Sequence, residues 1–388
     1  MFIDDMYRLY ISKQLFKPCC FGSKNIPVTS CPNLSETGGH SMKYVAVSDL
    51  YIQKEVFEEC LAAYPDIDYK IIHFGSDDRN TMREIFHKVE RNGPKAWPAP
   101  KELYEAIEDT DVLMVHTCPI PGDLIRRGKK LRAILTCRGG LENIDIETAT
   151  GLNIPVINNP AHNSNSVAEL AIGLMIDETR NISRSHMGLK QHQWREIYNN
   201  SGNIWELRKK TVGIIGFGNI GHLVAEKLNA FGCKLLVNDI RIDPEDEMLA
   251  RLPIRVTDLP TLMKESDIVT LHARSEDLIL SQEMLSLMKP SAFFINTARA
   301  HMVDYDTLYK LLRDRRIMGA ALEVHPTEPL PDDYPFLQLD NVTLTTHRGG
   351  DTINAFIDSP SMIMKDYQRY LAGKKPRFFA NPEVGMGR

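Results

Sequence analysis

The stretch that decides the fold is KKTVGIIGFGNIG, residues 209–221. Its apolar run is typical of a buried strand, the last three of its four glycines follow the spacing G-x-G-x-x-G, and the helix-like run HLVAEKLNAFG comes directly after them. In this context Gly216 allows a tight turn, Gly218 lets the backbone approach a pyrophosphate, and Gly221 lets the helix pack against the strand. Free amide groups at the helix start favour an anion there. The stretch therefore predicts a Rossmann-type dinucleotide site.

An acidic residue stands where such a site needs one. The next strand-like run, KLLVNDIR, places Asp239 close to the offset of about 20 residues at which an acid receives the cofactor ribose. A carboxylate there accepts a hydrogen bond from the 2′-hydroxyl of NAD and repels the 2′-phosphate of NADP. Arg241 keeps NADP open as a cofactor, but Asp239 favours NAD.

Short apolar runs alternate with helix-like segments on both sides of this stretch. Strands are expected at residues 43–47, 69–74, 111–115, 133–137 and 155–158, and again at 211–215, 234–238, 267–271, 292–296, 318–324 and 341–344. Strands of this length separated by helices indicate βαβ units and parallel sheets. The predicted fold class is α/β, with two Rossmann-like doubly wound domains, one flavodoxin-like and one dinucleotide-binding, separated by a cleft.

Two segments depart from the alternation. Residues 1–41 end in the polar stretch CPNLSETGGHS and read as a loosely ordered extension or the product of an upstream start, so the globular fold is expected to begin at Met42. The run SVAELAIGLMIDETRNI is apolar on most faces and predicts a long buried helix. Ser166 and Glu169 have the spacing of a capping box at its start.

The composition is that of an ordinary globular protein. The chain has 388 residues, 43% of them hydrophobic and 25% charged, with a net charge of −5, which gives no electrostatic footprint for nucleic acid or an anionic membrane. No apolar run reaches the roughly 18 residues of a membrane span, and the start MFIDD lacks the positive charge of a secretion signal. Seven irregularly spaced cysteines favour reduced thiols in the cytoplasm.

No metal is expected, because the spacing fits no zinc pattern at the four candidate ligands Cys19, Cys20, Cys31 and His40.

Three charged residues follow strand-like runs in the second half of the chain. Arg299 follows FFINTA, Glu328 lies a few residues past GAALEV, and His347 follows TLTT. Loops at the carboxyl ends of parallel strands line the ligand crevice, so the three side chains are expected to converge. Histidine suits proton transfer near neutral pH, a carboxylate orients the imidazole, and a guanidinium binds a substrate carboxylate in a bidentate manner. This set suits hydride transfer at a carbon that bears oxygen.

The segments GIIGFGNIG, INTAR, GAALEV with TEP, TTHRGG, RGGLENID and NSVAEL resemble the D-isomer-specific 2-hydroxyacid dehydrogenases, and the chain is phosphoglycerate dehydrogenase-like from Met42 onward. The resemblance implies an NAD-dependent enzyme that interconverts an (R)-2-hydroxy acid and its 2-oxo acid. Arg299 would bind the substrate carboxylate, Glu328 would support His347, and His347 would be the acid/base. A homodimer is implied, with a substrate domain formed by residues 42–160 and 347–388 and an NAD-binding domain at 161–346.

The resemblance also implies particular contacts. Asn219 and Ile220 would contact the pyrophosphate, and Glu323 would hold the nicotinamide carboxamide. The implied cofactor contacts are Gly216, Gly218, Asn219, Ile220, Gly221, Asp239, Ala273, Thr297, Ala298, Arg299, Glu323 and His347. The implied substrate contacts are Arg138, Gly139, Gly140 and Arg299.

Several residues depart from the family pattern. Glu323 stands where the family usually has Asp, and three arginines, Arg138, Arg274 and Arg348, replace small or apolar residues. Extra arginines near one cleft suggest a substrate with a second anionic or polyhydroxylated end, unless they pair with Glu142, Asp351 or other acids.

The loop His116-Thr117-Cys118 lacks the basic character of phosphoglycerate enzymes. The sequence ends soon after its last helix-like run, so no amino-acid-sensing domain is expected.

Two alternatives remain open. The first is an NAD(H)-sensing interaction protein of the corepressor type, since such proteins share this fold and keep its catalytic residues; the lack of a long disordered tail and of a basic surface argues against it. The second is an NADP-linked glyoxylate/hydroxypyruvate reductase, against which Asp239 argues. Turnover of NADH with 2-oxo acids tests the first alternative, and a comparison of NADH with NADPH tests the second.

Overall fold

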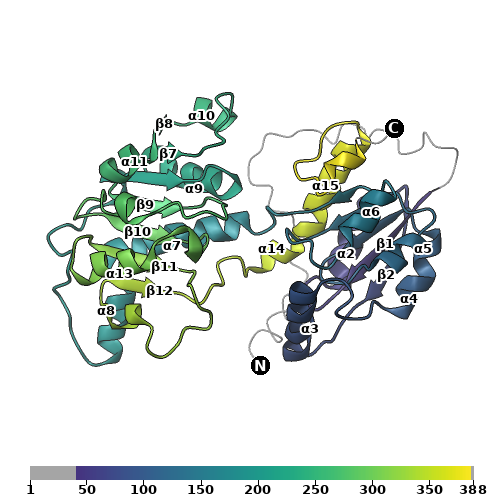
Figure 1. Ribbon diagram of the computed structural model, residues 1–388, viewed down its shortest axis with the longest axis horizontal. Helices are drawn as coiled ribbons and strands as arrows, with labels where there is room; N and C mark the ends of the chain where they lie inside the picture. Colours follow the sequence, from purple (N-terminus) through teal and green to yellow (C-terminus); the bar gives the residue numbers. More distant parts are fainter. Residues whose placement is uncertain (1–40, 386–388) are drawn as a thin grey trace. The chain divides into compact units, whose positions relative to one another are not determined.

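The computed structural model describes residues 41–385, and Figure 1 shows the order of their elements. The expected N-terminal extension lies outside these residues except for Ser41, as do Cys19, Cys20, Cys31 and His40. Within the described range, no helix combines the length and the apolar character needed to cross a membrane.

The first sheet has five parallel strands in the order β2-β1-β3-β4-β5. They are β1 (Met42–Ser48), β2 (Ile67–His73), β3 (Val112–Val115), β4 (Ala133–Thr136) and β5 (Val156–Ile157). The central strands β3 and β4 are buried along their whole length, as expected for a parallel sheet covered on both faces. The order reverses between β1 and β3, and this switch point is where such sheets place their ligand crevice.

Helices from both ends of the described chain pack on this sheet. They are α2 (Lys54–Ala62), α3 (Arg79–Asn92), α4 (Lys101–Ala106), α5 (Gly122–Arg127), α6 (Ile146–Gly151), α14 (Ile353–Ile357) and α15 (Ser359–Leu371), with short 3-10 turns η2 (Ile107–Asp109) and η6 (Pro382–Val384). The last helix, α15, buries Ile363, Met364 and Tyr367 against Tyr44 of β1. Beyond it, the Asn381 side chain accepts a hydrogen bond from the Val156 amide at 2.7 Å. The side chains of α15 and of Asn381 thus contribute to the packing of the first sheet.

The second sheet has seven parallel strands in the order β12-β11-β10-β9-β6-β7-β8. They are β6 (Thr211–Ile215), β7 (Lys234–Asn238), β8 (Ile254–Val256), β9 (Ile268–Leu271), β10 (Phe293–Asn296), β11 (Gly319–Leu322) and β12 (Val342–Leu344). Successive side chains point to opposite faces, so Ile214 lies in one core cluster and Ile215 in the other. The two predicted doubly wound α/β sheets are confirmed.

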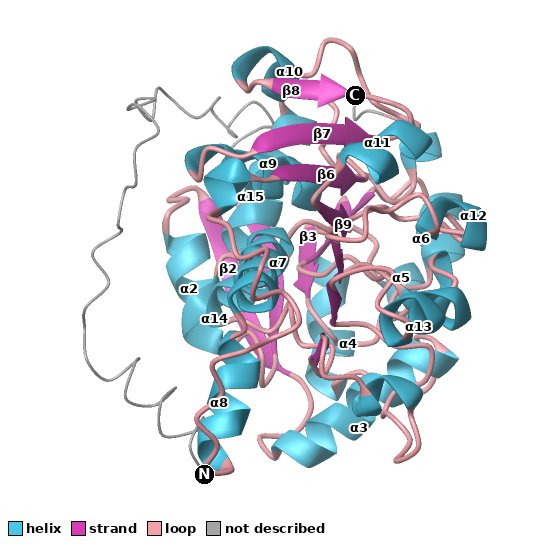
Figure 2. Ribbon diagram, turned by 90° about the vertical axis from the view of Figure 1, so that its left-hand side faces the viewer, coloured by secondary structure: helices cyan, strands magenta, loops and turns pink. Residues whose placement is uncertain are grey.

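Helices cover both faces of the second sheet (Figures 1 and 2). One face holds α7 (Ser164–Arg180) and α9 (Asn219–Ala230), and the other holds α11 (Leu259–Glu265), α12 (Gln282–Leu285) and α13 (Tyr305–Arg313). The remaining elements are α8 (Ile182–Lys190), α10 (Glu247–Arg251), η3 (Leu207–Lys209), η4 (Ala300–Met302) and η5 (Pro335–Gln338). The strand β6, the glycines and α9 therefore form the predicted strand–turn–helix unit.

One strand was missed and one local expectation was wrong. The sequence reading missed β8, a three-residue edge strand whose side chains are half-buried or exposed and therefore give no apolar run. The long helix α7 begins at Ser164, two residues early, and has no capping box. The Ser166 hydroxyl is 2.5 Å from the Thr352 hydroxyl, and Glu169 accepts a hydrogen bond from Asn165 within the helix. Ser166 thus ties the helix to the segment before α14.

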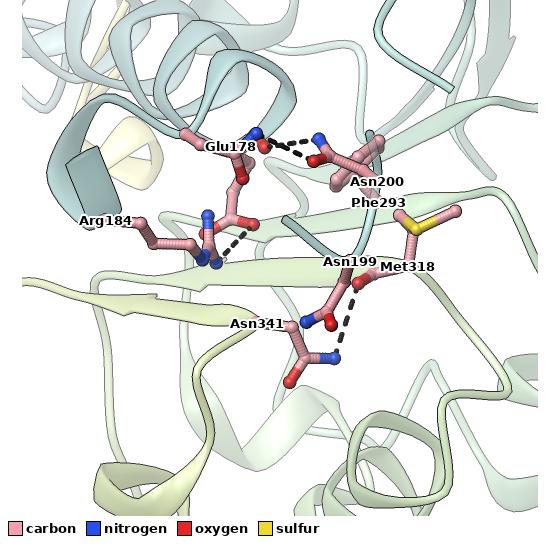
Figure 3. Close-up of a pocket in the computed structure, with 8 residues that line it drawn as sticks. Glu178, Arg184, Asn199, Asn200, Phe293, Met318 and Asn341 are labelled. Carbon is pink, nitrogen blue, oxygen red and sulfur yellow. Dashed lines mark hydrogen bonds and ion pairs between the residues drawn. The ribbon is translucent and has the colours of Figure 1, made fainter. Parts of the chain in front are cut away.

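A small polar pocket lies at the end of α7 (Figure 3). Burial raises the pKa of Glu178 to about 7, although the Arg184 guanidinium, 2.9 Å from both carboxylate oxygens, acts in the opposite direction. Asn200 donates to the carbonyl of Thr179, and Asn341 donates to the carbonyl of Met318. The Asn200 bond attaches the segment after α8 to the end of α7, and the Asn341 bond joins the start of β12 to the residue before β11, so the pocket has a structural role.

Candidate active site

The carboxyl ends of five neighbouring strands lie in register along one edge of the second sheet. Ile215 pairs with Leu271, Leu271 with Asn296, Asn296 with Leu322, and Leu322 with Leu344. The loops that follow these residues therefore start side by side. They carry the predicted site residues Gly216, Ala273, Thr297, Ala298, Arg299, Glu323 and His347.

The glycine-rich turn has the shape that a dinucleotide requires. Gly216 has a φ of +92°, and a Cβ there would lie 2.3 Å from the Ala273 amide nitrogen, so only glycine fits. A Cβ on Gly218 would meet no atom within 4 Å, which leaves open space beside the backbone at the helix start. Asn219 and Ile220 form the first turn of α9, where amide groups are free for an anion.

The acid expected to receive the ribose stands beside this turn. One oxygen of Asp239 accepts a hydrogen bond from the Phe217 amide at 2.7 Å, and the other accepts from the Arg241 amide at 2.8 Å. These two bonds fix the half-buried carboxylate at the end of β7. An anchored acceptor next to an open glycine turn fits the adenosine half of NAD.

The loop after β10 presents Arg299 with its charge unpaired. Asn296 clamps the loop, because its Oδ1 accepts from the Ala298 amide at 3.0 Å and its Nδ2 donates to the Arg299 carbonyl at 3.3 Å. The Arg299 side chain is exposed and donates to the Ala298 carbonyl at 2.7 Å. Within residues 41–385 it makes no ion pair, so the cation remains available for a carboxylate ligand. Thr297 is buried beside His272, whose burial lowers its pKa to about 3 and keeps that imidazole neutral.

His347 and Glu328 form a hydrogen-bonded pair. The Nδ1 atom of His347 is 2.8 Å from Oε2 of Glu328, and Oε1 of Glu328 accepts from the His325 amide at 2.9 Å. Partial burial would raise the pKa of Glu328, but the hydrogen bonds from His347 and His325 outweigh it and lower the pKa. The second ring nitrogen of His347, Nε2, bonds to no described residue. An imidazole held at one nitrogen and free at the other can transfer a proton to a ligand.

Glu323 does not lie free at the edge. It is 2% exposed, and its carboxylate accepts hydrogen bonds from the Thr345 hydroxyl and the Gly349 amide. It is thus turned toward the segment that carries His347.

Two of the three unusual arginines are paired with acids. Arg138 is buried and lies 3.1 Å from Glu90 and 3.4 Å from Glu142, and Arg348 lies 2.6 Å from Asp351. The pairing that the sequence left open as an alternative is therefore present for both. One guanidinium nitrogen of Arg138, Nη1, is buried without a partner in the described chain. Arg274 is exposed and makes no ion pair within residues 41–385.

The glycines next to Arg138 are closely packed. A Cβ on Gly139 would lie 2.8 Å from Cα of Pro160, and one on Gly140 would lie 2.3 Å from Oε2 of Glu142. The Gly139 backbone, after β4 in the first sheet, therefore approaches Pro160 as only glycine can, whereas a side chain at Gly140 would require the Glu142 carboxylate to move.

The sequence reading missed a buried ionisable pair at the switch point of the first sheet. Asp49 directly follows β1, His116 directly follows β3, and the Asp49 carboxylate is 2.9 Å from Nδ1 of His116. Burial would raise the pKa of Asp49, but His116, Thr117 and the Ile52 amide outweigh it and lower the pKa. Tyr51 and Phe356 pack against the imidazole with ring centroids 5.8 Å away. The strand order, combined with the residues that follow each strand, would have indicated this pair.

Comparison with known proteins identifies the fold and the family. Residues 172–349 match the family model described as D-isomer specific 2-hydroxyacid dehydrogenase, NAD binding domain. Hydroxypyruvate reductase of Thermotoga maritima is 36% identical over 284 residues, which cover 72% of this chain and 90% of that protein. D-3-phosphoglycerate dehydrogenase of Methanocaldococcus jannaschii is 37% identical over 71% of this chain, but the match spans 52% of that longer protein.

A solved structure shows the same architecture. The D-isomer specific 2-hydroxyacid dehydrogenase of Lactobacillus delbrueckii ssp. bulgaricus, in its NAD complexed form, superimposes with a TM-score of 0.68 at 22% identity, covering 88% of this chain and all of that one. At this identity the likeness concerns the fold. The family match and the Thermotoga relative show that the chain belongs to the D-isomer specific 2-hydroxyacid dehydrogenases, an oxidoreductase family with an NAD-binding Rossmann domain.

Proposed function

We propose that this protein interconverts an (R)-2-hydroxy acid and its 2-oxo acid by hydride transfer, with His347 as the acid/base. The observation that carries the proposal is the 2.8 Å bond between His347 and Glu328, at the same sheet edge as the glycine-rich turn. When bound, the nicotinamide cofactor supplies the hydride acceptor or donor. The chain's own residues bind the acid, orient it and move one proton.

Each side chain has one task in this proposal. Arg299, which has no acid partner in the described chain, binds the substrate carboxylate and fixes the carbon that reacts. During oxidation the free Nε2 of His347 accepts the hydroxyl proton, and during reduction it returns a proton to the carbonyl oxygen. Glu328 keeps Nδ1 protonated and stabilises the imidazolium that forms.

We favour NAD over NADP because Asp239 is fixed by two backbone amides. A 2′-phosphate at this position would meet a carboxylate that cannot turn away without breaking both bonds. Ala273, Thr297 and Ala298 are assigned to the nicotinamide side, since their loops start beside the glycine turn.

The substrate is proposed to be a small 2-oxo or 2-hydroxy acid whose far end bears hydroxyl or anionic groups. Arg138 supports this, because its Nη1 is buried without a partner beside Gly139 and Gly140. The ion pairs of Arg138 and Arg348 reduce the net positive charge, so a polyhydroxylated end suits the site better than a phosphorylated one.

We assign residues 42–160 and 347–388 to the substrate domain and 161–346 to the NAD-binding domain. The packing of α15 on the first sheet supports the return of the chain to the substrate domain. A homodimer is proposed from the segment after α7. Of the fifteen exposed large hydrophobic residues in the described chain, seven lie between Ile182 and Trp205, which is an apolar surface suited to a second copy.

The test is NADH oxidation by purified protein with a panel of 2-oxo acids, from glyoxylate and pyruvate to hydroxypyruvate and four-carbon sugar acids. We expect turnover of at least one acid with wild type and none measurable with His347→Ala. Equal rates with NADPH would favour the NADP-linked reductase instead. If NADH binds but no acid is reduced, the NAD(H)-sensing alternative replaces the proposal.

A further inference from the structure

The buried Glu323 carboxylate bonds to two groups that bracket His347. Glu323 follows β11, and its Oε1 accepts from the Gly349 amide at 2.5 Å while its Oε2 accepts from the Thr345 hydroxyl. These donors come two residues before and two residues after His347. A third contact, from Nε2 of His325 to the Thr345 carbonyl at 2.8 Å, holds the same segment from the neighbouring loop.

The segment needs such support because its backbone is in a conformation that it would not keep unaided. His347 has a backbone φ of +53°, in the left-handed region that residues other than glycine rarely adopt. Residues in sparsely populated regions persist only when the surrounding structure holds them. The last ladder residue of β12 is Leu344, and the Thr345 amide still donates to the Leu322 carbonyl of β11 at 3.1 Å, so the sheet does not hold residues 346–349.

The residue types at both ends of the contact between Glu323 and Gly349 suit their close approach. A Cβ on Gly349 would lie 3.3 Å from Oε1 of Glu323 and 2.9 Å from a methyl carbon of Leu170, so a larger residue there would displace the Leu170 methyl and crowd the carboxylate. A buried carboxylate is stable only when its oxygens accept hydrogen bonds, and these two donors satisfy both. Glu is one methylene longer than the Asp expected from the family pattern, which lets it extend further.

We propose that Glu323 is a positioning residue that clamps residues 345–349 and so keeps the His347 imidazole against Glu328. This replaces the expectation that Glu323 holds the nicotinamide carboxamide. The inference rests on the proposed role of His347 as acid/base. It predicts that changes at Glu323 act on the proton-transfer step and leave cofactor affinity unchanged.

Three variants test the clamp from both sides. Glu323→Asp shortens the side chain, and Thr345→Val removes one of the two donors while leaving Glu323 available for any cofactor contact. Thr343→Val is the matched control, because Thr343 lies in β12, two residues before Thr345, and its hydroxyl donates to the Asp177 carboxylate at 3.0 Å. All three remove or weaken one threonine–carboxylate hydrogen bond.

We expect Glu323→Asp and Thr345→Val each to lower kcat by about 10- to 100-fold, the range for slight misplacement of a reacting group. Each should also change the pH profile of kcat. The Kd of each for NADH, measured by fluorescence quenching, should match that of wild type. Thr343→Val should match wild type in kcat, in its pH profile and in the Kd for NADH. The double variant should be no worse than the poorer single variant, because both break one clamp. Glu323→Gln, which keeps length and shape, should retain more activity than Glu323→Asp.

The His347 ring protons provide a readout that needs no turnover. Their NMR resonances, identified by their loss in His347→Ala, should move in Glu323→Asp and Thr345→Val and stay in place in Thr343→Val. The clamp is wrong if Thr345→Val leaves kcat and these resonances unchanged while Glu323→Asp weakens NADH binding; Glu323 would then hold the carboxamide. If the resonances move but wild type turns over no acid, the clamp stands and the proposed reaction fails.

Discussion

The Nδ1 atom of His347 lies 2.8 Å from Oε2 of Glu328, although 19 residues and a strand separate them in the chain. The carboxylate is held from its other side by the His325 amide, so its orientation does not depend on the histidine alone. The pair thus places one polarised imidazole where the strand ends meet.

Replacing Glu328 by Gln is expected to lower kcat by about 10²- to 10⁴-fold, because general acid–base catalysis contributes that much and depends on an oriented imidazole. The hydrogen bonds lower the pKa of Glu328, so the carboxylate remains ionised down to a pH below its ordinary value near 4.5. The wild-type profile between pH 5 and 9 should therefore contain no step from Glu328. Steady-state kinetics across this range are the measurement. An unchanged kcat in Glu328→Gln would remove Glu328 from the mechanism.

The Asp49–His116 pair should make folding sensitive to acid. A carboxyl whose pKa is lower in the folded state adds stability above its unfolded pKa of about 3.9 and loses it as the pH falls through the folded value. Asp49→Asn keeps the shape but not the charge. Urea unfolding should show the variant less stable by about 1–3 kcal/mol at pH 7. That difference should shrink as the pH falls below 4; a constant difference would contradict the role of the charge.

His116 is also expected to influence substrate choice, because it lies at the switch point of the first sheet. In His116→Asn the side-chain amide can replace Nδ1 of the imidazole as the donor to Asp49. In His116→Gln the longer side chain places its amide near the position of Nε2. If Nε2 contacts the far end of the acid, His116→Asn should change the ranking of 2-oxo acids by kcat/KM, and His116→Gln should preserve it. The same panel of acids measures both variants. Equal effects would indicate that the pair serves stability alone.

Much of the fold could be predicted from sequence because the signals are local. The glycine turn, Asp239 and the strands of the second sheet's core follow from spacing and apolar runs. The edge strand β8 could not be found, since its exposed side chains give no pattern. Ser166 was misread as a cap because its partner, Thr352, lies far along the chain. The bonds of Arg138 to Glu90 and of Glu323 to Gly349 depend equally on tertiary contacts.

Asp239 is expected to set the cofactor preference. Asp239→Ser removes the charge that would oppose a 2′-phosphate and leaves a small hydroxyl in its place. A like-charge contact near the surface is worth about 1–4 kcal/mol, so the ratio of kcat/KM for NADH to that for NADPH should fall by about fivefold or more. Both cofactors should be titrated with one 2-oxo acid. A ratio that does not change would mean that the loop after β7, with Arg241, does not meet the 2′ position.

The apolar surface after α7 is expected to hold two copies together. Trp194 is 81% exposed and Ile197 is 79% exposed, and such side chains in one segment mark an interface. The double substitution Trp194→Ser/Ile197→Ser should shift the sedimentation coefficient from that of a dimer toward that of a monomer of 44.0 kDa. Leu278→Ser, which removes an exposed leucine outside this segment, is the control and should leave the mass unchanged. If wild type sediments as a monomer at micromolar concentration, the homodimer proposal is wrong. A dimer that survives the double substitution would instead place the interface on another face.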